Sequence, residues 1–106
     1  MFVRVLRMKL KRESGKGIAR AVDQEIVPIL KKFVGFAGEF TLVSNDGKEA
    51  LGVTLWDSRE NIETYNREGA ARVSKVLANY TQGKSESRTY DVTHSTVATV
   101  PARKAA

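Results

Sequence analysis

The sequence lacks cysteine altogether and holds a single histidine, His94, among its 106 residues. Without cysteine the chain forms no disulfide framework, no thiolate metal site and no cysteine nucleophile, and a reducing cytoplasm is its expected location. A lone histidine without cysteine partners provides no cluster of ligands, so no metal site is expected. No apolar run approaches the roughly 20 residues that cross a bilayer, which argues against a membrane protein.

Acidic residues are scarce at the N-terminal end. Residues 1–20 carry seven Lys or Arg and one Glu, so this segment accounts for the whole net charge of +6. Nucleic-acid binding is one explanation, because phosphate neutralisation needs grouped Lys and Arg. A solvated strand edge and loop is the simpler interpretation, and we favour it. An organelle transit peptide is disfavoured, because its removal would delete the first predicted strand.

Hydrophobic periodicity predicts six elements in one domain. Strands are expected at 2–10, 36–44, 48–56 and 86–94, with one helix after Ile18 and another after Asp57. A chain of this length buries one core. We assign that domain to residues 1–94 and expect a flexible C-terminal tail at 95–106.

Local signals refine these elements. Asn45-Asp46-Gly47 separates two alternating runs and predicts a hairpin. Pro28 lies inside the first helical stripe and should kink or split that helix, because proline has no N–H and its ring crowds the preceding turn. Asp57 with Glu60 fits a capping box at the start of the second helix, and Ser58 is a second candidate for its N-cap.

The element order is β-α-β-β-α-β, which predicts an α+β, ferredoxin-like fold: a four-stranded antiparallel sheet with two helices on one face. Both faces of strands 2–10 and 48–56 carry apolar residues. Two helices cover only one face, and a large exposed apolar face is a liability for a monomer. We therefore expect a homodimer that packs sheet on sheet, with Trp56 lining the space between the subunits.

Four segments carry a resemblance to a known family: Gly35-Phe36-Ala37-Gly38 at the second strand, LWDSRE at 55–60, the second helix with Gly69 in its middle, and TYDV at 89–92. Over nearly its whole length the chain resembles the antibiotic-biosynthesis-monooxygenase-like proteins of the dimeric α+β barrel superfamily. The resemblance implies that two ferredoxin-like subunits pair through their sheets to form a barrel. It also implies a ligand held between sheet and helices or inside the barrel.

Several activities occur among the proteins that the chain resembles, including cofactor-free oxygenation of aromatic polyketides, heme degradation and lactone isomerisation. The heme-degrading members use an Asn, a Trp and a His where an ungapped alignment on Trp56 places Leu6, Tyr65 and Lys75. These residues do not replace an axial imidazole or bind an iron-bound oxygen, so heme degradation is not expected. The resemblance instead implies a monooxygenase that needs no cofactor and acts on a hydrophobic aromatic small molecule.

Five residues are candidates for this chemistry. His94 belongs to the only residue type that normally titrates near neutral pH and is the candidate general base. Arg88 and Tyr90 alternate with it on the fourth predicted strand and would hold a phenol; if that strand ends before His94, the imidazole is solvated instead. Trp56 and Tyr65 are candidate ligand contacts, although a lone tryptophan at a strand end and a tyrosine on a helical stripe also suit the core.

Two other functions stay open at this point. The chain is compatible with a non-catalytic dimeric module that binds an apolar metabolite. It is less compatible with a nucleic-acid-binding protein, although RNA-recognition domains share its element order. Those domains stack bases on aromatic residues in the middle of their first and third strands, where this chain has aromatic residues only at the ends, Phe2 and Trp56.

Overall fold

The computed structural model describes residues 1–97. Its elements are β1 (Phe2–Leu10), α1 (Gly15–Ala21), the π-helix η1 (Val22–Ile26), α2 (Val27–Leu30), β2 (Phe36–Val43), β3 (Glu49–Trp56), α3 (Arg59–Glu68), α4 (Ala70–Leu77) and β4 (Thr81–Asp91). Part of the predicted tail, residues 98–106, lies outside the described residues.

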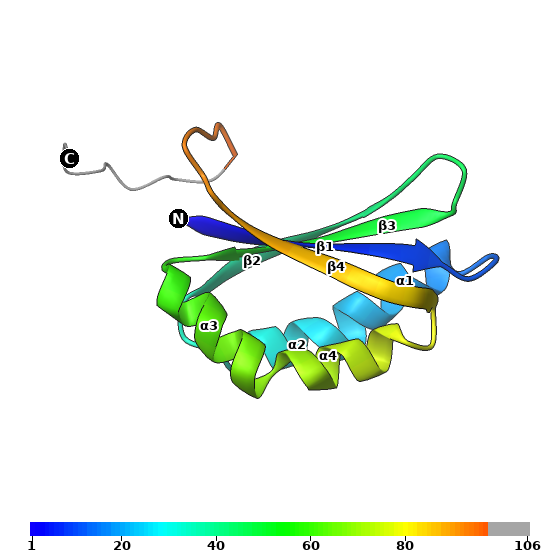
Figure 1. The fold of residues 1–106 in the computed structure, drawn as a ribbon, viewed down its shortest axis with the longest axis horizontal. Coiled ribbons are helices and arrows are strands. Elements are labelled where there is room, and N and C mark those ends of the chain that lie inside the picture. Colours follow the sequence, from blue (N-terminus) through cyan, green and yellow to red (C-terminus); the bar gives the residue numbers. More distant parts are fainter. Residues whose placement is uncertain (98–106) are drawn as a thin grey trace.

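The four strands form one antiparallel sheet in the order β2-β3-β1-β4. All helices lie on the same side of this sheet, as Figure 1 shows, with α1 to α2 and α3 to α4 running beneath it as two interrupted helices. The predicted ferredoxin-like α+β fold is therefore confirmed.

Strand register divides the sheet side chains between two faces. The covered face, on which the helices pack, carries Phe2, Arg4, Leu6 and Met8 of β1 opposite Trp56, Thr54, Gly52 and Ala50 of β3. The open face carries Val3, Val5 and Arg7 of β1, Leu51, Val53 and Leu55 of β3, Phe40 and Leu42 of β2, and Arg88 and Tyr90 of β4. Both faces are thus largely apolar, as predicted, but one layer of helices shields only one of them.

Trp56 is fully buried, with 0% of its surface exposed, and belongs to the core between sheet and helices. The expectation that Trp56 lies between two subunits is therefore wrong. Its position at the end of β3 directs the indole to the covered face, in register with Phe2 of β1 and Phe36 of β2. The open-face residue beside it in sequence is Leu55.

Pro28 divides the first helix, as predicted, and the hydrogen-bond pattern changes before the proline. The chain is α-helical to Ala21, π-helical over Val22–Ile26 and α-helical again over Val27–Leu30. The N–H of Val27, just before the proline, donates to the Val22 carbonyl five residues back, so the helical ladder is widened where Pro28 supplies no donor. The large buried residues of this segment recur every four positions, at Ile18, Val22, Ile26 and Leu30, and Ala21 is buried beside them.

The second helix begins at a different residue from the one we ranked first. Ser58, rather than Asp57, is the N-cap: its Oγ accepts a hydrogen bond from the backbone N–H of Asn61 at 3.2 Å and donates one to Asn61 Oδ1 at 2.7 Å. Asp57 is exposed, and its N–H donates to the Gly35 carbonyl at 2.8 Å. Asn61 therefore completes the cap in place of the predicted Glu60.

Gly69 ends α3 and precedes α4, so the helix is interrupted where the sequence predicts weakness. Glycine suits this position because a Cβ at Gly69 would overlap the Phe33 ring. The Phe33 ring in turn meets the Tyr65 ring edge-on, with centroids 5.5 Å apart. The interruption thus lets the loop after α2 approach the second helix closely.

The last strand begins and ends earlier than predicted. The range 86–94 is wrong, because β4 spans Thr81–Asp91 and pairs with β1 on both sides of an irregular stretch at 83–85. Polar residues at 81–85, which precede the predicted range, extend the strand past a register shift between Arg7 and Lys9. Gly83 adopts φ 73° in this irregular stretch. An edge strand with solvent on one side needs no hydrophobic alternation, which removes the signal on which the prediction depended.

Candidate ligand-binding site

A small inner cavity lies between the covered face of the sheet and the helices. Its volume is about 40 Å³, and residues from three strands and from η1, α2, α3 and α4 line it. The lining residues are Arg4, Leu6, Met8, Val22, Ile26, Leu30, Glu39, Thr41, Gly52, Thr54, Tyr65, Val73 and Leu77. Ligand pockets typically combine apolar walls with a few polar groups, and this cavity has that composition.

The polar groups of the inner cavity form a row across the sheet. Glu39 of β2, Thr54 of β3 and Arg4 of β1 are in register, so their side chains share the covered face. Thr41 Oγ1 donates a hydrogen bond to Glu39 Oε2 at 3.0 Å. The Trp56 indole N–H donates to Thr54 Oγ1 at 2.9 Å. The row therefore places a carboxylate and a guanidinium on opposite sides of one threonine.

Arg4 of β1 contacts Tyr65 of α3 across the space between the sheet and the helices. Its guanidinium carbon lies 5.5 Å from the centroid of the Tyr65 ring, which is a cation–π distance. Burial lowers the pKa of Arg4, because desolvation disfavours the charged form, and the nearby Tyr65 opposes that shift. Burial likewise raises the pKa of Tyr65, with the positive charge of Arg4 opposing the rise. At neutral pH the site thus contains a desolvated cation beside a protonated phenol.

The structure brings two of the five candidates from the sequence together. Tyr65 lines the inner cavity, and its ring packs against Trp56 with centroids 5.2 Å apart. Arg88 and Tyr90 lie on the open face, where they pair with Val5 and Val3 and face away from the helices. His94 follows the end of β4 and is exposed.

Sequence reasoning missed Arg4 and Glu39. The signal for Arg4 is present in FVRVLRMKL, where this arginine has the same phase of alternation as Phe2 and Leu6 and so must face the core with them. Glu39 carries no such signal. A register shift between Phe36 and Gly38 changes the phase of β2, and alternation read from the sequence then assigns residues to the wrong face.

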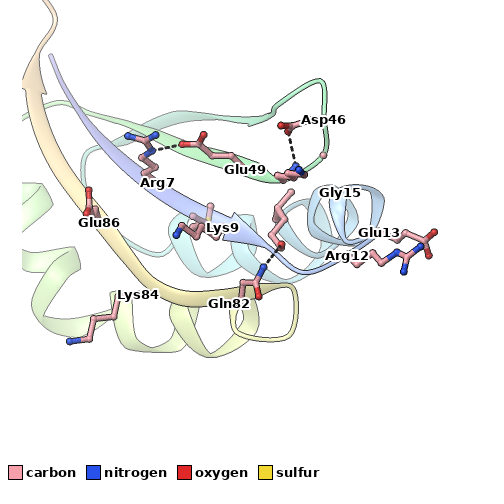
Figure 2. Close-up of a pocket in the computed structure, with 14 residues that line it drawn as sticks. Arg7, Lys9, Arg12, Glu13, Gly15, Asp46, Glu49, Gln82, Lys84 and Glu86 are labelled. Carbon is pink, nitrogen blue, oxygen red and sulfur yellow. Dashed lines mark hydrogen bonds and ion pairs between the residues drawn. The ribbon is translucent and has the colours of Figure 1, made fainter.

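A second hollow, the end groove, opens at the far end of the sheet and has a volume of about 860 Å³. Charged residues line it: Arg7, Lys9, Arg12, Lys48 and Lys84 with Glu13, Asp46, Glu49 and Glu86. Figure 2 shows Arg7 of β1 and Glu49 of the adjacent β3 pointing toward one another, where they form an ion pair. Hydrogen bonds from Ser44 and from the backbone N–H of Lys48 lower the pKa of Asp46.

Basic and acidic groups alternate in the end groove, so it is not a continuous positive surface. The N-terminal arginines also diverge: Arg4 faces the helices, whereas Arg7 pairs with Glu49 on the open face. The four carboxylates among these cations weaken the attraction of the groove for a phosphate backbone.

Within residues 1–97, no three His, Cys, Asp or Glu side chains come together as a possible metal site. The helices in the same range are also too short or too polar to cross a bilayer.

Comparison with known proteins gives a match by structure alone. No protein-family model matches the chain, and neither does any curated protein sequence. Among solved structures, the monooxygenase ActVA-Orf6 of Streptomyces coelicolor, in complex with the ligand Nanaomycin D, superposes with a TM-score of 0.71 at 16% identity. That match covers 95% of this chain and 92% of the other.

Two further structures agree. SnoaB, a cofactor-independent oxygenase from Streptomyces nogalater, matches with a TM-score of 0.69 at 11% identity over 90% of this chain and 95% of its own. A Bacillus cereus protein assigned as an antibiotic biosynthesis monooxygenase matches with a TM-score of 0.68 at 19% identity over 92% and 97% of the two chains. Identities this low establish shared architecture rather than shared chemistry. The chain therefore has the ferredoxin-like fold of the antibiotic biosynthesis monooxygenase structures.

Proposed function

We propose that the protein is a cofactor-independent monooxygenase that binds a hydrophobic aromatic small molecule in the inner cavity. The observation that carries the proposal is the row of Glu39, Thr54 and Arg4, which places polar groups in an otherwise apolar cavity. The fold shared with a cofactor-independent oxygenase and with a monooxygenase that binds Nanaomycin D supports it. The cysteine-free composition supports a cytoplasmic location.

The reaction class needs no metal or organic cofactor, because an ionised phenol is itself an electron donor to O₂. One oxygen atom of O₂ enters the ring as a quinone carbonyl. The other leaves as water, which takes the phenolic proton and the hydrogen of the oxidised ring carbon. The protein must remove the phenolic proton and exclude bulk water, and Glu39 is the carboxylate in the cavity that is placed to accept that proton.

The cavity must enlarge to admit such a substrate. Its volume of about 40 Å³ accommodates only a few water molecules, since each needs roughly 10–15 Å³ of this kind of volume. The helices opposite the sheet are interrupted at η1 and at Gly69, and breaks of this kind lower the cost of moving one helical segment relative to the next. The proposed function therefore requires the helical layer to shift on ligand binding.

An oxygen electrode tests this function with substituted naphthols as substrates, after subtraction of the uncatalysed rate. We expect oxygen uptake by the wild-type protein and a loss of about 10²-fold or more in Glu39→Gln, the size usually found for a general base. His94→Ala should keep the wild-type rate, because the exposed imidazole lines neither hollow. A loss of uptake in this variant would assign the base to His94 instead of Glu39. Wild-type uptake no faster than the blank would refute the proposal.

A non-catalytic binding module is the second candidate. It is favoured by the absence of histidine from the inner cavity, because His94 lies beyond β4. This candidate predicts that an aromatic ligand quenches the fluorescence of Trp56 and is recovered chemically unchanged. Recovery of the oxidised product instead would exclude it.

We also propose that a second copy of the chain covers the open face. Phe40 and Leu42 are each 50% exposed there and Tyr90 is 48% exposed, a degree of apolar exposure that favours a protein partner. Sedimentation at micromolar concentration should give twice the chain mass of 11.7 kDa, and Val53→Glu should give single chains. A wild-type protein that sediments as one chain would contradict the dimer.

A further inference from the structure

Arg4 lies on the core-facing side of its strand, where arginine is uncommon. It lies on the covered face of β1, between Phe2 and Leu6, and its neighbours in register are Thr54 and Thr89. Arginine normally reaches water from such a position or pairs with a carboxylate, because an isolated buried charge is costly. Arg4 is only partly exposed, and burial lowers its pKa.

No group of residues 1–97 neutralises this cation. The Arg4 Nε is inaccessible to water and donates no hydrogen bond to any of residues 1–97. The ion pair found in that range is Arg7 with Glu49, so no described carboxylate approaches Arg4 within 4.0 Å. Two acids share the covered face with Arg4: Glu39 is separated from it by the whole of β3 and receives a hydrogen bond from Thr41, and Asp91 of β4 is in register with Phe2 and forms no ion pair with Arg4.

Tyr65 does not replace the missing anion. Its ring offers the guanidinium a π face at 5.5 Å, which attracts a cation without neutralising it. Burial raises the pKa of Tyr65 from 10.0, so the hydroxyl keeps its proton at neutral pH. The guanidinium therefore keeps an unused donor at the wall of a cavity, and uncompensated groups of this kind mark sites where a ligand supplies the partner.

We infer that Arg4 is the residue that selects a negatively charged oxygen on the ligand, a phenolate, an enolate or a ring carboxylate. The inference rests on the proposed site in the inner cavity and adds a substrate class to it: aromatic molecules that carry an oxyanion, in preference to neutral aromatic molecules. Arginine suits this role because its planar donors remain charged and bind a carboxylate or phenolate through directed hydrogen bonds.

Calorimetric titration with three probes tests the preference: 2-hydroxy-1,4-naphthoquinone, which is anionic at neutral pH, its neutral 2-methoxy ether, and 2-naphthoic acid. We expect the wild-type protein to bind an anionic probe at least about tenfold more tightly than the ether, the effect of one charge-assisted hydrogen bond. A preference for the hydroxyquinone alone assigns a phenolate or enolate, and one for the naphthoate alone assigns a carboxylate.

Three variants separate a role in recognition from a role in folding. Arg4→Met should bind anionic and neutral probes alike, and Arg4→Lys should keep part of the preference. Arg72→Met removes an exposed arginine on α4 and should keep all of it. Equal binding of the three probes to the wild type, no binding of any probe, or an undiminished preference in Arg4→Met would overturn the inference.

Unfolding by urea without ligand provides a readout independent of binding. Because nothing in the described chain neutralises Arg4, Arg4→Met should unfold at the same urea concentration as the wild type or at a higher one. A clearly lower midpoint would mean that Arg4 has a structural role, and the inference would fail. Oxygen uptake distinguishes the two proposals: charge preference without uptake ends the oxygenase function alone, whereas uptake without charge preference ends the role of Arg4 alone.

Discussion

The covered and open faces of the sheet are built from alternate residues of the same strands, yet their environments are opposite. On the covered face Trp56 is 0% exposed, whereas on the open face Phe40 of the neighbouring strand is 50% exposed. Hydrophobicity does not distinguish the two faces, since both are rich in aliphatic and aromatic residues. The number of helices does: two interrupted helices shield one face, and the other needs a different partner.

Two arginines of β1, one on each face, differ in the same way in their exposure and in their ion pairing. Arg7, on the open face, is exposed and paired with Glu49. Arg4, on the covered face, is half-buried and has no carboxylate partner within residues 1–97. The pairing is thus the reverse of what desolvation alone would favour, since the cation with less water also has less protein compensation. The pair of Arg7 with Glu49 is an exposed one, of a kind that contributes little to stability, and ligand recognition is our explanation for Arg4.

Truncating an aromatic residue on each face should give the largest difference. Trp56→Ala removes the largest fully buried side chain and should cost about 3–5 kcal/mol in the free energy of unfolding. Phe40→Ala should cost less than about 1 kcal/mol in dilute protein, where any dimer has dissociated. Urea unfolding at several protein concentrations measures both. Equal losses at every concentration would abolish the contrast between the faces.

Glycine substitutions should sharpen the contrast between packed and solvated backbone. Gly35 and Gly47 both have positive φ, 85° and 72°, but a Cβ at Gly35 would overlap Asn61, whereas nothing lies within 4 Å of one at Gly47. Gly47→Ala should cost about 1 kcal/mol for the left-handed backbone alone. Gly35→Ala should cost about 2–4 kcal/mol, because overpacking is added. Similar melting temperatures for the two variants would contradict the close packing at Gly35.

Capping residues at the start of α3 should give an intermediate effect. Ser58→Ala removes the N-cap acceptor for the Asn61 N–H and should cost about 1 kcal/mol. Asp57→Ala, at the neighbouring exposed position, should change the stability by less than about 0.5 kcal/mol. Denaturant midpoints of the two variants compare the half-buried cap with its solvated neighbour. A larger loss in Asp57→Ala would return the cap to the residue ranked first from the sequence.

The smallest effect should appear in alkali and concerns the covered face alone. Because burial raises the pKa of Tyr65 above 10.0, the unfolded chain loses this proton before the folded chain does. The stability contributed by the protonated phenol is complete below pH 10.0 and is lost as the pH rises further. Tyr65→Phe should therefore flatten the decrease in melting temperature above about pH 10. An unchanged slope would mean that Tyr65 is solvated.

Much of this architecture is predictable from the sequence, because the hydrophobic periodicity and the turn and helix-breaking residues indicate the same element boundaries. The hairpin at Asn45-Asp46-Gly47 and the division at Pro28 follow from local chemistry, and the apolar residues on both sides of β1 and β3 follow from alternation. The boundaries of β4 were not predictable in this way, because an exposed edge strand needs no apolar residues. The boundaries of β4 are set by its pairing with β1, which is far away in the sequence.

The candidate site was harder to predict. Tyr65 was found through its helical stripe, and Arg4 carried a signal in its phase with Phe2 and Leu6 that was not used. Glu39 depends on the register shift in β2, which only the folded sheet specifies. His94 attracted attention as a residue type, whereas its position depends on where β4 ends.

The π-helix η1 sets how the chain tolerates a change in length. The large buried residues of this segment are four positions apart, whereas an α-helix advances about 100° per residue and would turn such a series by about 40° at each step. The wider turn at Val22–Ile26 absorbs that drift and keeps Ile18 and Leu30 on the same side. Deleting one residue there would leave eleven α-helical steps of about 100° between Ile18 and Leu30, which is close to three whole turns, so both side chains would stay in the core. We therefore expect this segment to tolerate the loss of one residue better than α1 or α4 would.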